Sequence, residues 1–315
     1  MEGVPALLKH VRGEMARVVV GQEEMRDQCL VALLCRGHAL VEGVPGIAKT
    51  LAVKTLARLL TLSFQRVQAT SDLMPADIVG TNVLNLASST FQLHRGPVFT
   101  DLLLVDEVNR MPPRTQAALL ECMEERQVTI DGTRHPLSPA FTVFATQNPV
   151  EFEGTYPLPE AQLDRFLLKI RAEYPTAADE LQLLANAQAG FDSRALDDMP
   201  LCAIDCEVLA RAQQDVREVK VQETLFSYIV QVARRTREWP SLALGASPRA
   251  ALALLAVSKA FASMDGRDYL LPDDVKASVG PVLRHRVLLK PEADLEGLTS
   301  DHVLEEVVRA VEVPR

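Results

Sequence analysis

The chain has 315 residues, of which 48% are hydrophobic and 24% charged, as is typical of a folded protein with room for two domains. A formal net charge of −9 disfavours nonspecific binding to DNA or to an anionic membrane surface. No apolar run could span a bilayer, and the first residues lack the apolar core of a secretory signal. We therefore expect a cytoplasmic protein without membrane insertion.

Helical and strand-like segments alternate in the first half of the chain, which predicts an α/β domain with a parallel sheet. Two runs, 101–106 and 140–146, are continuously apolar, as expected of central strands that are covered on both faces. The segment 115–126 between them is amphipathic with helical spacing. The other predicted elements are helices at 23–37 and 51–60 and a strand at 39–42.

Two segments are predicted to be hairpins inserted into this domain. Residues 81–96 alternate between polar and apolar around Ser88 and Ser89. Residues 127–139 place Asp131-Gly132 between two short strand-like runs, which is a strong local hairpin signal.

The character of the sequence changes near residue 175. Strand-like runs almost vanish there, and helical patterns continue to the C-terminus. We therefore predict an α/β domain at 1–175 and an all-helical domain at 176–315, with a loop at 196–204 inside the second.

The octapeptide Gly-Val-Pro-Gly-Ile-Ala-Lys-Thr at 43–50 follows the phosphate-loop pattern G-x-x-x-x-G-K-[ST], except that Ala48 replaces the second glycine. It lies between a predicted strand and a predicted helix, which is the context that the motif needs. Backbone N–H groups at the start of that helix would cradle a polyphosphate. Lys49 would reach the outer phosphates, and the Thr50 hydroxyl would hold Mg²⁺.

Polar side chains follow two of the predicted central strands. Asp106 and Glu107 end the first, at the carboxyl edge of the sheet, where ligands bind in doubly wound folds. Asp106 would belong to the Mg²⁺ shell, and Glu107 would orient and deprotonate the attacking water. Asn148 ends the next strand and could position that water, although Asn-Pro is also an ordinary start of a turn.

Two arginines are further candidates. Arg165, near the end of a short helical stretch, could reach a neighbour's nucleotide as an arginine finger or could pair with Asp164 or Glu160. Arg249 follows Ser247-Pro248 in the first turn of a predicted helix, where the helix dipole disfavours a cation. A compensating anion is therefore expected there, either the γ-phosphate of a nucleotide or a nearby carboxylate.

Taken in chain order, these motifs resemble those of AAA+ ATPases, and the finer matches resemble the MoxR branch, in which alanine at the position of Ala48 is usual. The resemblance covers residues 15–290. It implies a P-loop NTPase αβα sandwich with a five-stranded parallel sheet, followed by an all-helical AAA+ lid domain. The matching segments are 18–22, 43–50, 105–110, 145–149, 163–166 and 245–249, with the branch-specific matches at 71–78, 123–129 and 156–166.

The resemblance also assigns roles to the residues that match the family's motifs. It implies that ATP or ADP and Mg²⁺ are the cofactors, that Thr50 and, through water, Asp106 hold the metal, and that Glu107 is the Walker B glutamate. Asn148 matches sensor 1, Arg165 the arginine finger and Arg249 sensor 2. The implied nucleotide-binding residues are Gly21 and Gln22 near the adenine, then Gly43, Val44, Pro45, Gly46, Ile47, Ala48, Lys49, Thr50, Leu51 and Asp106.

At the level of function, the resemblance implies Mg²⁺-dependent ATP hydrolysis in a ring, usually a hexamer. Family members are thought to act as chaperone-like remodellers that mature protein complexes by metal or cofactor insertion, beside a partner with a von Willebrand A domain. A nucleotide-gated scaffold with negligible turnover is one alternative. A nucleic-acid motor is another; the acidic net charge disfavours it, although Arg126, Arg134 and His135 form a small basic cluster near the second hairpin.

Two charged groups have no assigned role. Glu121, Glu124 and Glu125 are interpreted as a solvated helix face. The triplet Arg284-His285-Arg286 either touches a neighbouring subunit or ends a helix in solvent. Both interpretations leave these side chains exposed in a single subunit.

Overall fold

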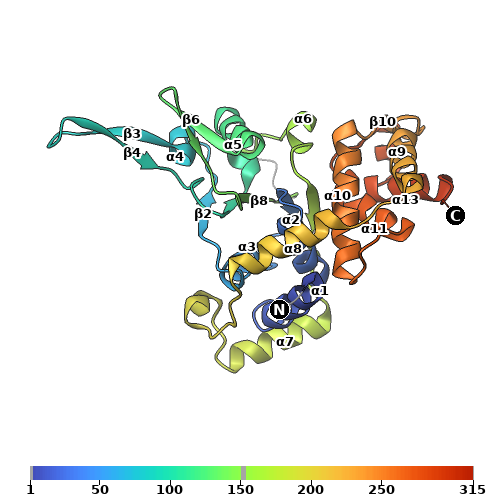
Figure 1. Cartoon of the computed structure of the whole chain (residues 1–315), viewed down its shortest axis with the longest axis horizontal. Coiled ribbons are helices and arrows are strands. Elements are labelled where there is room, and N and C mark those ends of the chain that lie inside the picture. Colours follow the sequence, from blue (N-terminus) through green and yellow to red (C-terminus); the bar gives the residue numbers. More distant parts are fainter. Residues whose placement is uncertain (1–2, 150–153, 315) are drawn as a thin grey trace.

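The computed structural model describes residues 3–149 and 154–314, which form an α/β body and a helical lid (Figure 1). A five-stranded sheet in the order β2-β5-β8-β1-β9 forms the centre of the body, and every neighbouring pair is parallel. The predicted fold class is therefore confirmed. The strands are β1 (Ala39–Glu42), β2 (Phe64–Gln68), β5 (Leu102–Asp106), β8 (Thr142–Gln147) and β9 (Leu168–Arg171).

Both faces of the sheet are covered, which explains why its central strands read as continuous apolar runs. Leu102 and Leu104 of β5 point to the hydrophobic cluster built with the first three helices and the lid. Leu103 and Val105 point to the other face, where the fifth helix packs. The body helices are α1 (Gly3–Ala16), α2 (Glu23–Leu34), α3 (Lys49–Leu59), α4 (Pro75–Val79), η1 (Val108–Arg110), α5 (Pro113–Glu125) and α6 (Glu160–Leu163).

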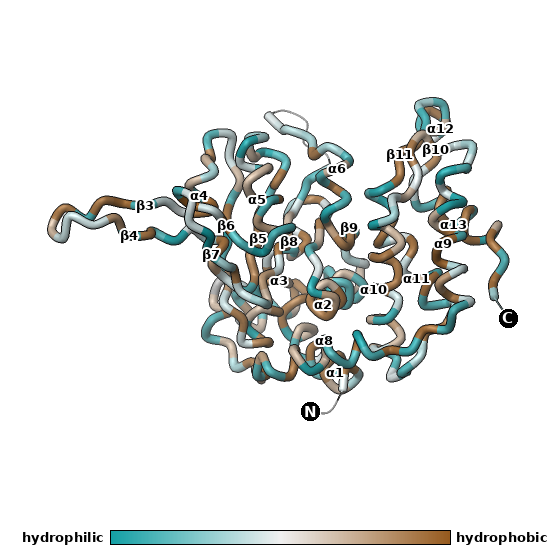
Figure 2. Tube along the Cα trace, turned by 45° about the horizontal axis from the view of Figure 1, so that its top comes forward, coloured by the Kyte–Doolittle hydropathy of each residue, from teal (hydrophilic) through white to brown (hydrophobic). Residues whose placement is uncertain are grey.

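Two antiparallel hairpins lie outside the central sheet. Strands β3 (Gly80–Asn85) and β4 (Thr90–Arg95) pair along their whole length and project from the body (Figure 1). The tip of this hairpin is apolar (Figure 2), with Leu86 and Phe91 exposed. The second hairpin joins β6 (Gln127–Ile130) to β7 (Thr133–Pro136) through Asp131-Gly132, both with positive φ.

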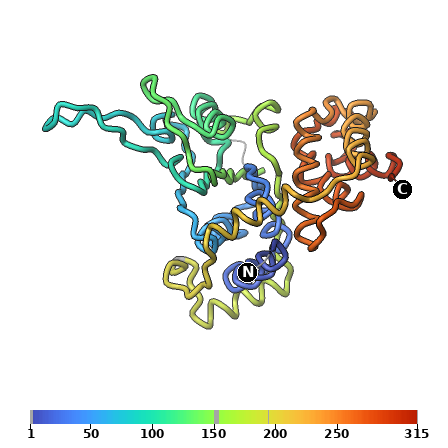
Figure 3. Tube along the Cα trace, viewed as in Figure 1, coloured from blue at the N-terminus to red at the C-terminus, as the bar shows by residue number. Residues whose placement is uncertain are grey.

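In the remainder of the described chain the regular elements are helices, apart from one short strand pair. From α7 (Ala177–Gln188) at the edge of the molecule the chain returns through α8 (Cys206–Glu218), which packs against α1, and then enters the lid, which begins with α9 (Glu223–Arg237) (Figure 3). One short antiparallel pair, β10 (Leu242–Leu244) with β11 (Leu288–Leu289), lies within the lid and was not predicted, because strands this short have no visible periodicity. The helices are α7 (Ala177–Gln188), η2 (Ser193–Asp198), α8 (Cys206–Glu218), α9 (Glu223–Arg237), α10 (Pro248–Met264), α11 (Pro272–Leu283), α12 (Pro291–Leu295) and α13 (Ser300–Ala310).

The predicted loop at 196–204 is wrong for its first three residues, because η2 continues to Asp198. Buried side chains of α1, α2, α8 and α10 belong to one hydrophobic cluster, so body and lid share a core. Among the described residues, no helix combines the length and the apolar character needed to cross a membrane.

His38, just before β1, is a buried titratable group in this core. Its Nδ1 accepts a hydrogen bond from the backbone N–H of Val143 at 2.9 Å, and its Nε2 lies 3.1 Å from the carbonyl oxygen of Met123. A neutral ring with its proton on Nε2 satisfies both partners. Burial, followed by the charge of Arg126, lowers the pKa of His38 to about 4.

Acidification should therefore destabilise the protein through His38. An unfolded histidine takes up a proton near pH 6.5 whereas the folded ring resists until about pH 4, so stability is present above 6.5 and is lost as the pH falls through this window. The loss should reach roughly 2–3 kcal/mol at pH 4.5. Urea unfolding at pH 7.5 and 4.5 measures it, and His38→Asn should show a smaller pH dependence. An unchanged dependence in that variant would contradict the assignment.

Candidate active site

The phosphate-loop segment leads from the end of β1 into α3. Gly46 and Ala48 have φ of +86° and +66°, so both adopt the left-handed conformation. Ala48 directly precedes α3, where glycine would meet no strain and alanine costs about 1 kcal/mol. Gly43 has no room for a side chain, since a Cβ there would lie 2.5 Å from the carbonyl oxygen of Ala172.

A cavity of about 730 Å³ opens between this loop, the carboxyl edge of the sheet and the segment from α7 to η2. At one end its lining is apolar, which suits the flat aromatic base of a nucleotide. The residues of this apolar lining are Val18, Val19, Leu183, Ala187 and Phe191. No sequence pattern indicated the three of these residues that come from α7 and the segment after it. The predicted nucleotide residues that line the cavity are Gln22, Pro45, Gly46, Ile47, Ala48, Lys49, Thr50, Leu51 and Asp106.

Three predicted nucleotide residues, Gly21, Gly43 and Val44, lie outside the lining of this cavity in the described structure. Gly43 still contributes indirectly, because its carbonyl oxygen accepts a hydrogen bond from Lys49 Nζ. Gly21 has φ of +64° and lies against the carboxylate of Asp179 in α7. These glycines shape the backbone around the cavity.

Asp106 is the centre of a polar network at the other end of the cavity and is only 6% exposed. The Thr50 hydroxyl lies 3.3 Å from each of its carboxylate oxygens. Arg66 Nε approaches Oδ2 at 2.6 Å, and the Thr146 hydroxyl approaches Oδ1 at 3.2 Å. The Thr146 oxygen also accepts the backbone N–H of Glu107 at 2.9 Å, so it fixes both acids to the end of β8.

Glu107 lies at the wall of the cavity with its side chain 31% exposed. Its backbone is left-handed, with φ of +58°, which turns the chain sharply after β5. Gln68 Nε2 donates to its carboxylate at 3.1 Å, and Arg110 Nε lies 3.0 Å from the same oxygen. Asn148 lines the same cavity and is 6% exposed, so the amide and the acid border one space.

The oxygen donors of the cavity suit Mg²⁺. A hydroxyl and a carboxylate within 3.3 Å of each other, Thr50 and Asp106, are hard ligands that leave most coordination positions to water and phosphate. Within the described ranges, no group of three or more His, Cys, Asp or Glu side chains could hold a metal ion. This donor set fits a metal that binds together with a nucleotide.

The two predicted catalytic arginines lie away from this cavity. Strands β1 and β9 are parallel, and the phosphate loop follows β1, whereas Arg165 precedes β9. They therefore lie at opposite edges of a sheet whose four-residue strand β1 spans about 13 Å. Arg165 and Arg249 line a separate cavity of about 340 Å³ on the amino-edge side.

Glu124 of α5 is the anion beside both arginines. Its carboxylate lies 3.3 Å from Arg165 Nη1 and 2.6 Å from Arg249 Nη2. The compensating anion near Arg249 is thus the nearby carboxylate, and Arg165 pairs with Glu124 instead of Asp164 or Glu160. Glu121, Glu124 and Glu125 are exposed, as the solvated helix face predicts, but Glu124 has an additional role because the lid places Arg249 against it.

In the triplet Arg284-His285-Arg286, His285 and Arg286 are buried and Arg284 is partly buried, so it does not end a helix in solvent. The Arg286 side chain is 2% exposed and donates to the carboxylate of Asp164 at 2.7 Å and to the carbonyl oxygens of Phe166 and Leu167 at 2.6 and 3.0 Å. Burial and the charge of Arg286 lower the pKa of His285 well below its usual value. The triplet therefore fastens the lid to the segment that carries Arg165.

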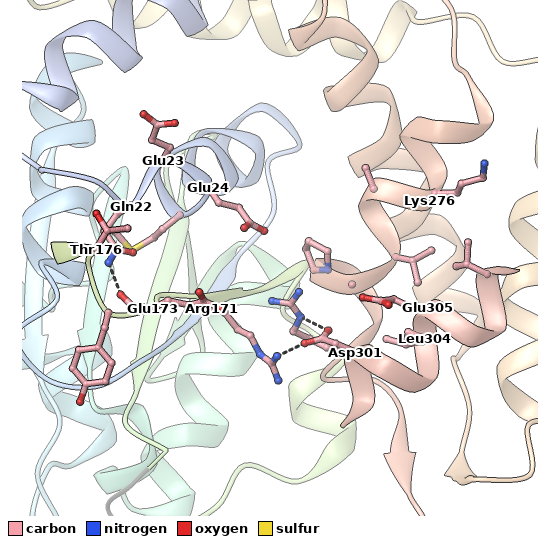
Figure 4. A pocket seen from close by; sticks show the side chains of 18 of the residues that line it. Gln22, Glu23, Glu24, Arg171, Glu173, Thr176, Lys276, Asp301, Leu304 and Glu305 are labelled. Carbon is pink, nitrogen blue, oxygen red and sulfur yellow. Dashed lines mark hydrogen bonds and ion pairs between the residues drawn. The ribbon is translucent and has the colours of Figure 1, made fainter. Parts of the chain in front are cut away.

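A third cavity, of about 650 Å³, lies between the body and lid helices α11 and α13 (Figure 4). Arg171 at the end of β9 pairs with Asp301 of α13 across it, and Asp301 also accepts from Arg284 at 2.9 Å. Gln22 lines this cavity as well as the phosphate-loop cavity, and its amide donates to the carbonyl oxygen of Glu173 at 2.5 Å. Gln22 thus lies where the nucleotide cavity meets the body–lid junction.

The fold and the cavity define the class as a P-loop ATPase with a helical lid. The family model described as "ATPase family associated with various cellular activities (AAA)" matches residues 38–168, and "AAA lid domain" matches 234–307. The chain is 40% identical to "Chaperone MoxR1" of Mycobacterium tuberculosis, over 96% of this chain and 81% of that protein. It is 41% identical to the uncharacterized protein YeaC of Bacillus subtilis, over 99% and 97%.

A crystal structure of a candidate ATPase from Cytophaga hutchinsonii has a TM-score of 0.90 to this chain at 40% identity, with 99% of this chain and 96% of that chain covered. Sequence and structure therefore agree over nearly the full length. The chain belongs to the MoxR family of AAA ATPases.

Proposed function

We propose that the protein hydrolyses ATP with Mg²⁺ in the cytoplasm, as a ring-forming homo-oligomer, usually of six copies. The observation that carries this proposal is the convergence of a phosphate loop, a water-activating acid and an amide on one cavity. Lys49, Thr50 and Asp106 would hold the nucleotide and its metal there. Glu107 would deprotonate the attacking water, and Asn148 would help to position it.

In this mechanism the phosphate-loop N–H groups and Lys49 bind the outer phosphates, while Mg²⁺, when bound, neutralises charge on them. Glu107 takes a proton from the water that attacks the γ-phosphorus, and the bond from that phosphorus to the β-phosphate oxygen breaks. Gln68 holds the Glu107 carboxylate before the reaction. The arginines that would stabilise the departing charge come from a neighbouring copy, because they lie at the opposite edge of the sheet.

ATP hydrolysis would serve a chaperone-like role. The Mycobacterium tuberculosis relative is named a chaperone, which supports this role, and so does the family resemblance of the sequence motifs. We propose a von Willebrand A domain protein as partner and, as client, a protein complex that takes up a metal or cofactor. Copurification from the native host tests both, and recovery of neither would contradict them.

Phosphate release from Mg²⁺-ATP by the purified protein tests the proposed activity. Lys49→Ala should remove hydrolysis and weaken ATP binding about 10- to 100-fold, through loss of charge-assisted hydrogen bonds. Lys54→Ala is the matched control, since Lys54 lies on the same helix but pairs with Asp197 at 2.9 Å outside the cavity.

Wild-type activity in Lys49→Ala would show that this cavity is not the site. Tight ATP binding without phosphate release by the wild-type protein would favour the nucleotide-gated scaffold.

A further inference from the structure

We propose that Glu124 is a positioning residue that holds Arg165 and Arg249 side by side for the nucleotide of a neighbouring copy. The inference rests on the proposed function, because it requires ATP hydrolysis at the contact between copies. It adds a third residue to the arginine side of the site and links the lid to that site.

Glu124 lies in the last turn of α5 and joins two other segments of the chain. Its Oε2 lies 3.3 Å from Arg165 Nη1, before β9, and its Oε1 lies 2.6 Å from Arg249 Nη2, at the start of the lid helix α10. Arg165 Nη1 also donates to the carbonyl oxygen of Leu120, in the same helix, at 2.9 Å. The carboxylate therefore fixes the relative position of two cations from different parts of the fold.

The electrostatics of the cluster require such an anion. Two guanidinium groups that share one carboxylate lie close enough to repel each other, and a negative charge between them offsets the repulsion. Their cavity is strongly basic, with only two acids against five arginines. Its charged lining consists of Arg36, Arg126, Arg165, Arg249 and Arg286 together with Glu124 and Asp164.

The hydrogen-bond geometry indicates that Glu124 positions the two arginines and does not block their access to a phosphate. Each guanidinium has five N–H donors in a planar fork. Within the described part of the chain, Glu124 engages only Nη2 of Arg249 and Nη1 of Arg165. The arginine side chains remain 33% and 47% exposed, so their other donors can reach a phosphate while the carboxylate keeps its place.

The neighbouring residues hold the same two segments together. Asp164, next to Arg165, accepts from the Ser247 hydroxyl at 3.0 Å, and Ser247 is the N-cap of α10. Arg286 of the lid donates to the same carboxylate. A lid movement that shifts Arg249 would therefore also move the support of Arg165, so the two arginines respond together.

Steady-state ATPase measurements on Glu124→Gln test the proposal. The substitution keeps the shape of the half-exposed side chain and removes its charge. We expect kcat to fall about tenfold or more at an unchanged KM for ATP, because the chain's own nucleotide cavity is untouched. Glu125→Gln, the matched loss of one charge on the same exposed helix end, should stay within about twofold of wild type.

A double-mutant cycle separates this role from a structural one. If Glu124 acts through the arginines, Glu124→Gln should have no further effect in the Arg165→Ala/Arg249→Ala background. An equal loss in that background would overturn the proposal, as would wild-type or increased kcat in Glu124→Gln alone. A wild-type protein without ATPase activity would overturn the proposed function as well, whereas an active wild type with an unaffected Glu124→Gln overturns this inference only.

Discussion

Glu107→Gln should lower the turnover of ATP by about 10²- to 10⁴-fold, the usual contribution of a general base, while ATP binding survives. Glutamine keeps the length of the side chain and an oxygen that can accept from Gln68, which donates to Glu107 at 3.1 Å. It cannot take a proton from water. The phosphate loop and Asp106 are unchanged, so the affinity for nucleotide should stay close to that of the wild type.

Two measurements on the same variant check this result: phosphate release at saturating Mg²⁺-ATP, and ATP affinity by calorimetry. Glu173→Gln is a suitable control, because Glu173 is an exposed acid in the cavity of Figure 4 and outside the lining of the phosphate-loop cavity. Wild-type turnover in Glu107→Gln would mean that another group activates the water. Loss of binding together with turnover would mean that Glu107 supports the cavity rather than the reaction.

The sequence predicted those parts of this site whose residues lie together in one continuous segment of the chain. The phosphate loop and the acids after β5 each consist of a strand end and the residues that follow it, so local spacing determines both their chemistry and their edge of the sheet. The parallel arrangement then brings the two segments together. Ala48 belongs to the same group, since its left-handed backbone is a property of the turn itself.

The residues that the sequence did not predict depend on pairings between distant segments. Arg66 and Gln68 meet the acids because β2 pairs in parallel with β5, with Gln68 opposite Asp106. Strand β2 is polar and largely exposed, so it has no apolar run that would reveal it. Helical spacing correctly placed Glu124 on an outer face, but it could not show that a lid residue 125 positions later lies on top of it.

The same limit explains the burial of His285 and Arg286 in the lid triplet. Arg284, His285 and Arg286 are charged or titratable, and such residues are mostly exposed. Arg286 is buried because backbone carbonyl oxygens of the segment before β9 accept its N–H groups, and no local pattern predicts those partners. Burial and Asp164 act in opposite directions on the pKa of Arg286, and burial prevails.

Arg165→Ala should lower turnover about 10³-fold, the scale of an arginine finger, without weakening ATP binding. The arginine lies at the amino edge of the sheet and the phosphate loop at the carboxyl edge, so within one copy the two cannot share a nucleotide. The affinity of ATP for the variant should therefore equal that of wild type. Arg211→Ala, which removes an arginine that is 77% exposed on α8, should leave turnover unchanged.

Mixing variants then distinguishes an arginine that acts between copies from one that acts within a copy. A subunit with Arg165→Ala keeps an intact nucleotide cavity, and a subunit with Lys49→Ala keeps an intact Arg165. In a mixed oligomer, a site is complete where the cavity of an Arg165→Ala subunit receives the arginine of a Lys49→Ala subunit. Turnover of the mixture should exceed that of either variant alone. A partner with both Lys49→Ala and Arg165→Ala should give no such gain. If light scattering shows that the copies assemble and turnover still does not recover, Arg165 does not act across the contact between copies. Arg165 would then reach a nucleotide only in its own copy, after a conformational change that brings the two edges of the sheet together.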